Sequence, residues 1–233
     1  MEHDATPELA QMRALADPAH AAKIAAQHKS GRETLGLRPA QIDALVADWR
    51  AARDVEGRVA LARALWDADI HEARLAAGKL LTQARIQPDE AVWALIGEWV
   101  PQIDGAAIAD AVSAAGQRRV TRERLSGMLA WADSRNPWLR RSLLTMTQPL
   151  AKMPHPKPED LEMREEVLEA AGTLADVAHG AVQQALGAWL RDLARRDPER
   201  AEAFAAEHDL KPVARRAAGL PDQAPDQAPD AER

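Results

Sequence analysis

The chain has 233 residues, a formal net charge of −6 at pH 7 and no cysteine. The lack of cysteine excludes disulfides, thiolate catalysis and thiolate metal sites. The sequence has no run of about 18 apolar residues, so we expect no membrane span. The first twenty residues carry acids and no apolar stretch, which predicts no secretory signal and favours a cytoplasmic protein.

The residue usage predicts an all-α fold. The chain has seven tryptophans and one phenylalanine but no tyrosine, and strands are usually rich in aromatic and β-branched residues. Alanine, leucine, arginine, glutamate and glutamine dominate instead, and these residues favour helices.

Helical periodicity recurs along the chain, with apolar residues three or four positions apart and short breaks between segments. In the first such segment, 38–52, Ile42, Val46 and Trp49 share one face. The pattern then recurs, in chain order, over residues 56–68, 69–84, 88–100, 101–112, 121–132, 136–153, a segment through Val167 and Leu174, 182–196 and 198–208.

Ten or more helices joined by short loops predict stacked antiparallel helical pairs, as in a HEAT-like α-solenoid. The sequence shows no strict period, so a compact helical bundle stays open as the alternative. We expect one solenoid domain over residues 1–219, with a break at the proline-rich segment 153–160, "MPHPKPED", which we expect to be a non-helical loop. Residues 220–233 repeat Pro-Asp-Gln-Ala without an apolar face and are predicted to form a disordered acidic tail.

Two aspartates in the segment "PQIDGAAIADAV" have different expected roles. Asp104 precedes a helix and can cap it by accepting a backbone N–H bond. Asp110 lies inside the same helix, where aspartate is a mediocre helix former, on a face shared with Ala106 and Ala107. A carboxylate in such a place is either a structural ion-pair partner or a functional acid, and the local pattern leaves both interpretations open.

A net charge of +5 gathers over residues 117–141 of this otherwise acidic chain. Arginine forks match phosphate geometry, so the window predicts either a phosphate-contacting surface or a solvated helix face. Arg140 and Arg141 follow Trp138, itself either a core residue or an aromatic contact, and lie about 100° apart on a helix. We expect one of them to reach DNA and the other to pair with an acid such as Asp133. The other arginines of the window are Arg118, Arg119, Arg122, Arg124 and Arg135.

Other catalytic patterns are missing from the sequence. His71 and Glu72 do not begin a zinc-binding HExxH helix, because position 75 is leucine. The chain also lacks a serine-nucleophile elbow and a Gly-rich phosphate loop. We therefore expect no metal and no cofactor.

Five segments, taken in order, resemble the DNA alkylation repair family, the AlkD-like HEAT-repeat DNA glycosylases. The most specific is "ALWDADIHEARLAA" (64–77), in which Leu65-Trp66 closes one helix and His71-Glu72-x-Arg74 opens the next. The others are "ETLGLRPAQI" (33–42), "IDGAAIADAV" (103–112), "NPWLRRSLL" (136–144) and "ALGAWLRDLARRDPE" (185–199).

The resemblance implies an α-solenoid whose concave face binds duplex DNA and releases cationic N-alkylated purines without swinging the base into a pocket. In the family an Asp stabilises the developing positive sugar, two Trp contact that sugar, and an Arg holds a backbone phosphate. Matched by position, Asp110 takes the catalytic role and Arg141 the phosphate-holding role. The two Trp positions are occupied by Ala106 and Ala188, with Trp189 adjacent as a candidate aromatic substitute.

Losing the two aromatic contacts weakens the expected activity. By analogy with base–aromatic stacking, each contact contributes ~1–3 kcal/mol, and such a pair corresponds to roughly a hundredfold or more in rate or affinity. We therefore predict a repair protein that binds duplex DNA, with alkylpurine glycosylase activity weakened or lost. The alternative is a non-catalytic HEAT-like scaffold that binds a protein partner or structured DNA. A single basic groove holding Asp110, Arg140 and Arg141 would favour the first interpretation.

Overall fold

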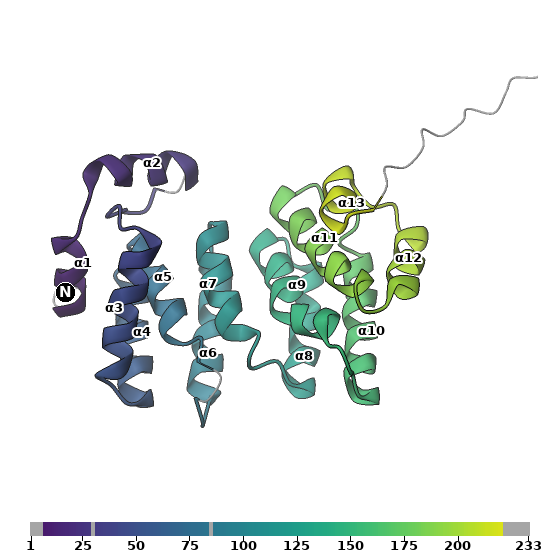
Figure 1. The fold of residues 1–233 in the computed structure, drawn as a ribbon, viewed down its shortest axis with the longest axis horizontal. Helices are drawn as coiled ribbons and strands as arrows, with labels where there is room; N and C mark the ends of the chain where they lie inside the picture. Colours follow the sequence, from purple (N-terminus) through teal and green to yellow (C-terminus); the bar gives the residue numbers. More distant parts are fainter. Residues whose placement is uncertain (1–6, 29–30, 84–85, 221–233) are drawn as a thin grey trace, which may run out of the picture. The chain divides into compact units, whose positions relative to one another are not determined.

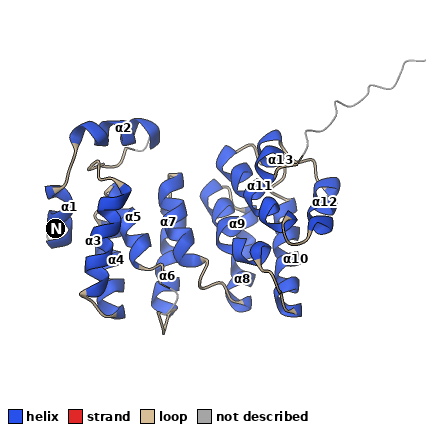
Figure 2. Ribbon diagram, in the orientation of Figure 1, coloured by secondary structure: helices blue, strands red, loops and turns tan. Residues whose placement is uncertain are grey.

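The computed structural model describes residues 7–28, 31–83 and 86–220. In these residues the chain forms thirteen α-helices, two short 3-10 helices and no strand (Figure 2). The all-α prediction is confirmed. The predicted tail, residues 220–233, lies outside the described residues except for Leu220.

The helices fall into two compact units, Met1–Thr121 and Arg122–Arg233 (Figure 1). Each unit is a set of packed helices joined by short loops, and the prediction of one domain over residues 1–219 stays a prediction. The first unit comprises α1 (Pro7–Ala14), α2 (Pro18–His28), α3 (Pro39–Ala51), α4 (Val55–Asp67), α5 (His71–Leu80), α6 (Glu90–Trp99), the 3-10 helix η1 (Val100–Gln102) and α7 (Ala106–Gly116). The second comprises α8 (Arg122–Leu129), the 3-10 helix η2 (Ala130–Asp133), α9 (Pro137–Lys152), α10 (Pro158–Gly172), α11 (Gly180–Ala194), α12 (Pro198–Glu207) and α13 (Pro212–Ala218).

Helix α5 is the centre of the first unit, in contact with α3, α4 and α7 (Figure 1). Small residues make this possible, because Ala73, Ala76 and Ala77 are fully buried and let neighbouring backbones approach. Gly78 marks the closest approach: a Cβ there would lie 2.8 Å from the backbone carbon of Ala111 in α7. The sequence of α5 therefore fixes how closely α7 packs against it.

The apolar stripes read from the sequence form the core. Ile42, Val46 and Trp49 of α3 are all buried, as the periodicity predicts. Between α4 and α6, Trp66 and Trp99 stack with ring centroids 4.5 Å apart and an interplanar angle of 7°. Stacked aromatic pairs stabilise a fold beyond the effect of their buried area alone.

In the second unit α11 contacts α9, α12 and α13. The Leu-Gly step of this helix has a steric cause, because a Cβ on Gly187 would lie 2.4 Å from the carbonyl oxygen of Ala214 in α13. Glycine therefore lets α13 lie directly on α11. Trp189 of α11 and Phe204 of α12 are fully buried in this core.

The proline-rich segment 153–160 is a loop only in its first part. Residues 153–157 connect α9 to α10, whereas residues 158–160 form the first turn of α10. Proline suits the first helical position, where its missing N–H would have no partner. The carboxylate of Asp160 accepts the backbone N–H of Lys157 at 2.9 Å. The prediction that the whole segment is non-helical is therefore wrong for residues 158–160.

Candidate functional site

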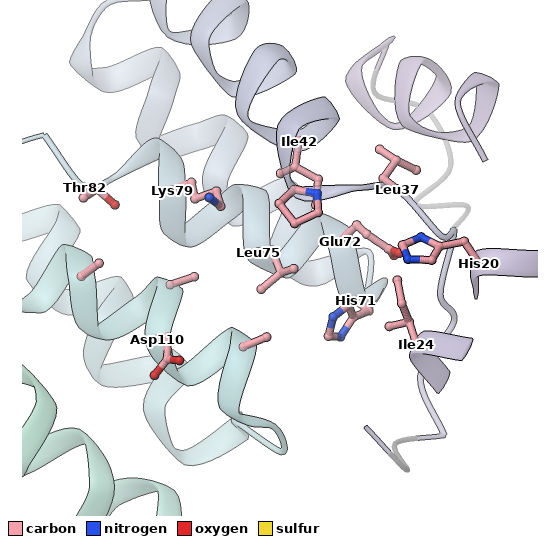
Figure 3. A pocket seen from close by; sticks show the side chains of 14 residues that line it. His20, Ile24, Leu37, Ile42, His71, Glu72, Leu75, Lys79, Thr82 and Asp110 are labelled. Carbon is pink, nitrogen blue, oxygen red and sulfur yellow. The ribbon is translucent and has the colours of Figure 1, made fainter. Parts of the chain in front are cut away.

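Asp110 is exposed on α7 and lines a pocket of about 570 Å³ within the first unit. Side chains from α2, α3, α5 and α7 surround this pocket. Figure 3 shows Asp110 on one side and His20 and Ile24 of α2 on the other. The lining outside α2 and α7 includes Leu37, Ile42, His71, Glu72, Leu75 and Lys79.

The α7 wall of the pocket consists of small residues. Ala107, Ala111 and Ala114 line it at positions four and three residues apart, so they share one helix face with Asp110. Methyl groups fill little space, and a longer side chain at these positions would take up part of the pocket. The small-residue face noted in the sequence is therefore one side of a cavity.

Glu72 holds the chain that closes one end of the pocket. Its buried carboxylate accepts the backbone N–H groups of Leu35 at 2.9 Å and Gly36 at 2.7 Å. Gly36 has φ = +85°, a region that favours glycine, and a Cβ there would lie 2.1 Å from the carbonyl oxygen of Asp17. The Nδ1 atom of His20 lies 2.7 Å from the Gly36 carbonyl oxygen. These bonds join α2, the segment before α3, and α5.

Asp104 is not the cap that the sequence predicts. The N-cap of α7 is Gly105, and Asp104 instead accepts two hydrogen bonds from Arg32, at 2.6 and 2.7 Å. Arg32 also donates to Asp69 at 2.6 Å. Burial lowers the pKa of Arg32, but the hydrogen bonds to Asp69 and Asp104 outweigh it, so the pKa is raised. Through these two ion pairs, Arg32 connects Asp104, just before α7, to Asp69, just before α5.

The remaining part of the His71-Glu72-x-Arg74 motif is structural. The guanidinium of Arg74 lies 4.5 Å from the ring centroid of Trp66 and donates to the Gln102 carbonyl oxygen at 3.2 Å. Burial lowers the pKa of Arg74, and the nearby Arg32 lowers it further. The backbone N–H of His71 donates to the carbonyl oxygen of Glu33 at 2.9 Å. This motif fixes the packing of α5 against its neighbours.

In the second unit Trp138, Arg140 and Arg141 lie in the first turns of α9. The side chain of Asn136 caps this helix by accepting the Trp138 N–H at 2.9 Å. The Trp138 ring is half-buried and meets the ring of His179 edge-on, with centroids 5.8 Å apart. The contact between Trp138 and His179 therefore brings the start of α9 next to the start of α11.

The two adjacent arginines both donate to backbone carbonyl groups. Arg140 is half-buried and its Nε donates to the Ala132 oxygen at 3.1 Å. Arg141 is only 9 % exposed, and its Nη1 donates to the Ala181 oxygen at 3.0 Å. Arg140 is therefore the more accessible of the two, which the sequence did not distinguish.

Other arginines of the basic window differ in their surroundings. Arg118 is exposed, but Arg119 is 3 % exposed and donates to the carbonyl oxygens of Ala115 at 2.6 Å and Gln83 at 3.1 Å. This burial leaves little of the Arg119 side chain exposed, and its contact with DNA stays a prediction. Arg122 forms ion pairs with Glu162 and Glu166 of α10.

The two positions where the family resemblance implies tryptophan differ in exposure. Ala106 is exposed at the start of α7, and Ala188 is half-buried on α11. Trp189 is 0 % exposed. The prediction that Trp189 supplies a substitute aromatic surface is wrong, because its ring lies wholly in the core of the second unit.

The structure shows neither a clustered metal site nor a membrane helix in the parts of the chain it describes. Within residues 7–28, 31–83 and 86–220, no group of three or more His, Asp or Glu side chains is placed to hold a metal ion. Over the same ranges, no helix has both the length and the apolar character that crossing a bilayer requires.

The sequence patterns missed α2, which supplies His20 and Ile24 to the pocket. The signal that could have found it is Asp17-Pro18, a capping residue followed by proline at the first helical position. The carboxylate of Asp17 indeed accepts the backbone N–H of His20 at 3.0 Å. Ile24 is the one large apolar residue of α2, so apolar periodicity alone does not indicate this helix.

Comparison with known proteins identifies a similar fold and a matching family. A solved structure described as a predicted DNA alkylation repair enzyme from Enterococcus faecalis matches with a TM-score of 0.71 and 22 % sequence identity, over 88 % of this chain and 95 % of that chain. Among curated proteins, no sequence matches the chain. The family model of the DNA alkylation repair enzymes matches residues 9–219. The chain therefore belongs to the DNA alkylation repair enzyme family.

Proposed function

We propose that this protein binds duplex DNA and slowly hydrolyses the N-glycosidic bond of cationic N-alkylated purines, with Asp110 as the catalytic carboxylate. The observation that supports this most directly is the exposed Asp110 beside a pocket in a chain of this family. An alkylated purine is already a cation and a good leaving group. A fixed carboxylate near the sugar then stabilises the positive charge that grows in the transition state.

The contacts to the phosphate backbone are proposed for Arg118, Arg140 and Arg141, with Trp138 beside them. Arg118 is exposed and Arg140 is half-buried, so both can reach a ligand. Guanidinium groups bind phosphate oxygens in a bidentate manner and give affinity that falls with salt. Arg141 is held by the Ala181 carbonyl, which orients its guanidinium. A cytoplasmic location stays a prediction.

The low rate follows from Ala106 and Ala188, which replace the two tryptophans that the family resemblance implies. The loss of two stacking contacts of ~1–3 kcal/mol each corresponds to a rate or affinity that is lower by roughly a hundredfold or more.

The decisive experiment is purine release from alkylated duplex DNA. We expect slow release by the wild type and none by Asp110→Asn, which keeps the side-chain shape but removes the charge. The double variant Ala106→Trp plus Ala188→Trp should accelerate release by about tenfold or more, since it restores two aromatic contacts. Equal release by the wild type and Asp110→Asn would rule out a catalytic role for this carboxylate.

A second candidate function is a non-catalytic scaffold that binds a protein partner. The observation that favours it is the engagement of Arg119 and Arg122 in bonds within the chain, which reduces the basic surface. The two functions separate in a duplex-binding measurement at low salt. Absence of binding there would leave the scaffold as the better proposal.

A further inference from the structure

We propose that Lys79, in the last turn of α5, binds a backbone phosphate of duplex DNA, and that Asp43 of α3 competes with the DNA for this ammonium group. The inference rests on the proposed function and deepens it, because it adds a phosphate contact in the first unit. The positions matched through the family resemblance do not include Lys79. The inference does not depend on the charge of Asp110.

Lys79 lies at one end of the pocket described above. Lys79 and Thr82 line this end, whereas His20 and Glu72 line the other (Figure 3). Seven residues of α5 separate Lys79 from Glu72, which corresponds to about 10 Å along the helix axis. The carboxylate of Glu72 already accepts two backbone N–H groups. An anion at Lys79 is therefore remote from this buried charge.

The ammonium group of Lys79 has a partner that it can exchange. Its Nζ lies 2.6 Å from Oδ1 of Asp43, and the two side chains are 35 % and 58 % exposed. Ion pairs so open to water contribute little to stability. Lysine carries its charge on a flexible four-carbon stem and binds phosphate as a point charge. Lys79 can therefore turn from the carboxylate to a phosphate without a change in the core.

Positive charge is in excess around Asp43. Arg50 of α3 is half-buried, and its Nη2 donates to the backbone carbonyl oxygen of Lys79 at 2.6 Å. Burial lowers the pKa of Arg50, the charge of Arg58 lowers it further, and the charge of Asp43 opposes both effects. Within the described residues, Arg50 and Arg58 donate to carbonyl and amide oxygens. One carboxylate is thus shared by two cations with a third nearby, which favours a phosphate here.

The spacing of charges along DNA fits a contact at this end. One strand carries a phosphate for about every 3.4 Å of helix axis. A strand that lies along the pocket with a sugar at Asp110 therefore presents further phosphates toward Lys79, since α5 and α7 are in contact. A cation that neutralises a phosphate releases a counterion, so the contact adds affinity without sequence preference.

Acetylation of lysine tests the contact in the unaltered protein. The reagent is sulfo-N-hydroxysuccinimide acetate, and mass spectrometry follows each lysine separately. An undamaged duplex at ten times its dissociation constant should slow acetylation of Lys79 by about tenfold, because only the free protein then reacts. Lys157, at the start of α10 with its side chain 76 % exposed, is the internal control and should keep its rate. Equal protection of the two lysines would contradict the inference.

Inorganic phosphate is the second probe in this experiment. At the same concentration of phosphate groups it should protect neither lysine, since one ammonium group holds a free phosphate only weakly. Equal protection of Lys79 by inorganic phosphate and by the duplex would assign the site to free phosphate, and the inference would be wrong.

Fluorescence anisotropy of a labelled duplex measures the charge effect. Lys79→Met should reduce the slope of log affinity against log salt by about 1, as expected for the loss of one phosphate contact. Lys79→Arg keeps the charge and should keep the slope. Arg63→Met is the matched control, because Arg63 is also paired with an acid, Glu98, and it should leave the slope unchanged. Equal reductions by Lys79→Met and Arg63→Met would overturn the inference.

The competition with Asp43 has its own test. Asp43→Asn should raise the affinity for the duplex, and more so with Lys79 present than in the Lys79→Met background, because only the former gains a released ammonium group. Asp48→Asn removes the same charge from an exposed position of α3 and should act equally in both backgrounds. Equal gains from Asp43→Asn in the two backgrounds would contradict the competition.

Purine release from alkylated duplex separates this inference from the proposed function. Release by the wild type without protection of Lys79 would overturn the inference and leave the proposed function standing. Protection of Lys79 without purine release would do the reverse for the catalytic part of that function. If the wild type binds no duplex at low salt, both fail.

Discussion

Glu72 shows how a charged residue can be wholly structural. Its carboxylate is 0 % exposed and accepts two backbone N–H groups from a segment 36 and 37 residues earlier in the chain. A buried charge is tolerated only when hydrogen bonds replace its water. The sequence showed a His-Glu pair at a helix start, a pattern shared by metal sites, and the tertiary contacts reveal a different role.

The substitution Glu72→Gln should lower the free energy of unfolding by about 2–4 kcal/mol, because hydrogen bonds to a charged acceptor are strong and the new amide would face a backbone donor. Urea denaturation followed by circular dichroism measures this. The control Glu56→Gln, on the exposed first turn of α4, should cost less than about 1 kcal/mol. Equal effects of the two substitutions would contradict the structural role.

Asp17 predicts a dependence on pH at the start of α2. The backbone N–H of His20 has the largest effect and lowers the pKa of this carboxyl; desolvation opposes it, and the N–H of Ala19 and the charge of Arg38 lower the pKa further. A pKa lowered in the folded state means that the ionised form stabilises the fold. This stability is present above the ordinary pKa and is lost as the pH falls through the lowered one.

The backbone amide resonance of His20 should therefore shift on acidification through that range. The control is Asp17→Asn, whose side chain still accepts a hydrogen bond but does not titrate. NMR spectra recorded across the acid range would show the shift in the wild type and its absence in the variant. A shift of the same size in both would assign it to another group.

At the scale of helices, glycine positions decide how closely neighbours pack. The substitution Gly78→Ala should destabilise the protein by about 1–3 kcal/mol, because the added Cβ would lie 2.8 Å from the backbone of Ala111 and overpacking strains the neighbouring helix. It should also slow purine release, since Asp110 lies on the displaced helix. Thermal unfolding and the release assay measure the two effects.

Gly97→Ala is the matched control on α6, where the added Cβ meets nothing within 4 Å. Because alanine is the better helix former, this change should stabilise the protein by about 0.5–1 kcal/mol. Destabilisation by Gly97→Ala would show that glycine-to-alanine changes act here through something other than helix contacts.

The helices that the sequence indicated best are those with wide apolar stripes. The stripe of Ile42, Val46 and Trp49 in α3 is buried as predicted, because spacing along a helix directly determines which side chains share a face. α2 lacks such a stripe, so periodicity does not indicate it, and only its Asp17-Pro18 start marks it in the sequence. Pro158 was predicted to lie in a loop but begins α10. Proline can end a helix or occupy its first position, and the residues around it determine which of the two occurs.

At the scale of the whole molecule, the resemblance indicated the family, but local patterns could not assign the arginines. Seven arginines in one window suggested a continuous basic surface. The structure shows Arg119 buried and Arg122 paired with two glutamates of α10. Such partners lie about 40 residues away along the chain or in other helices, so spacing within the window could not reveal them. The same limit applies to Asp104, whose partner is Arg32.

Duplex binding should depend on salt through the remaining arginines. Arg140→Ala should reduce the slope of log affinity against log salt by about 1, as expected for the loss of one phosphate contact. Arg63→Ala removes the same charge from α4, where Arg63 pairs with Glu98, and should leave the slope unchanged. Fluorescence anisotropy of a labelled duplex across a salt series measures both. Equal reductions would indicate a general charge effect rather than a contact.

The stacked pair of Trp66 and Trp99 gives the first unit its own optical signature. Two indoles this close and nearly parallel couple their electronic transitions, and that coupling ends once α4 and α6 separate. Circular dichroism in the indole absorption bands should therefore follow the melting of residues 1–121. Loss of amide helicity reports on the entire chain, so comparing the two signals would show whether the halves of the protein unfold together or in sequence.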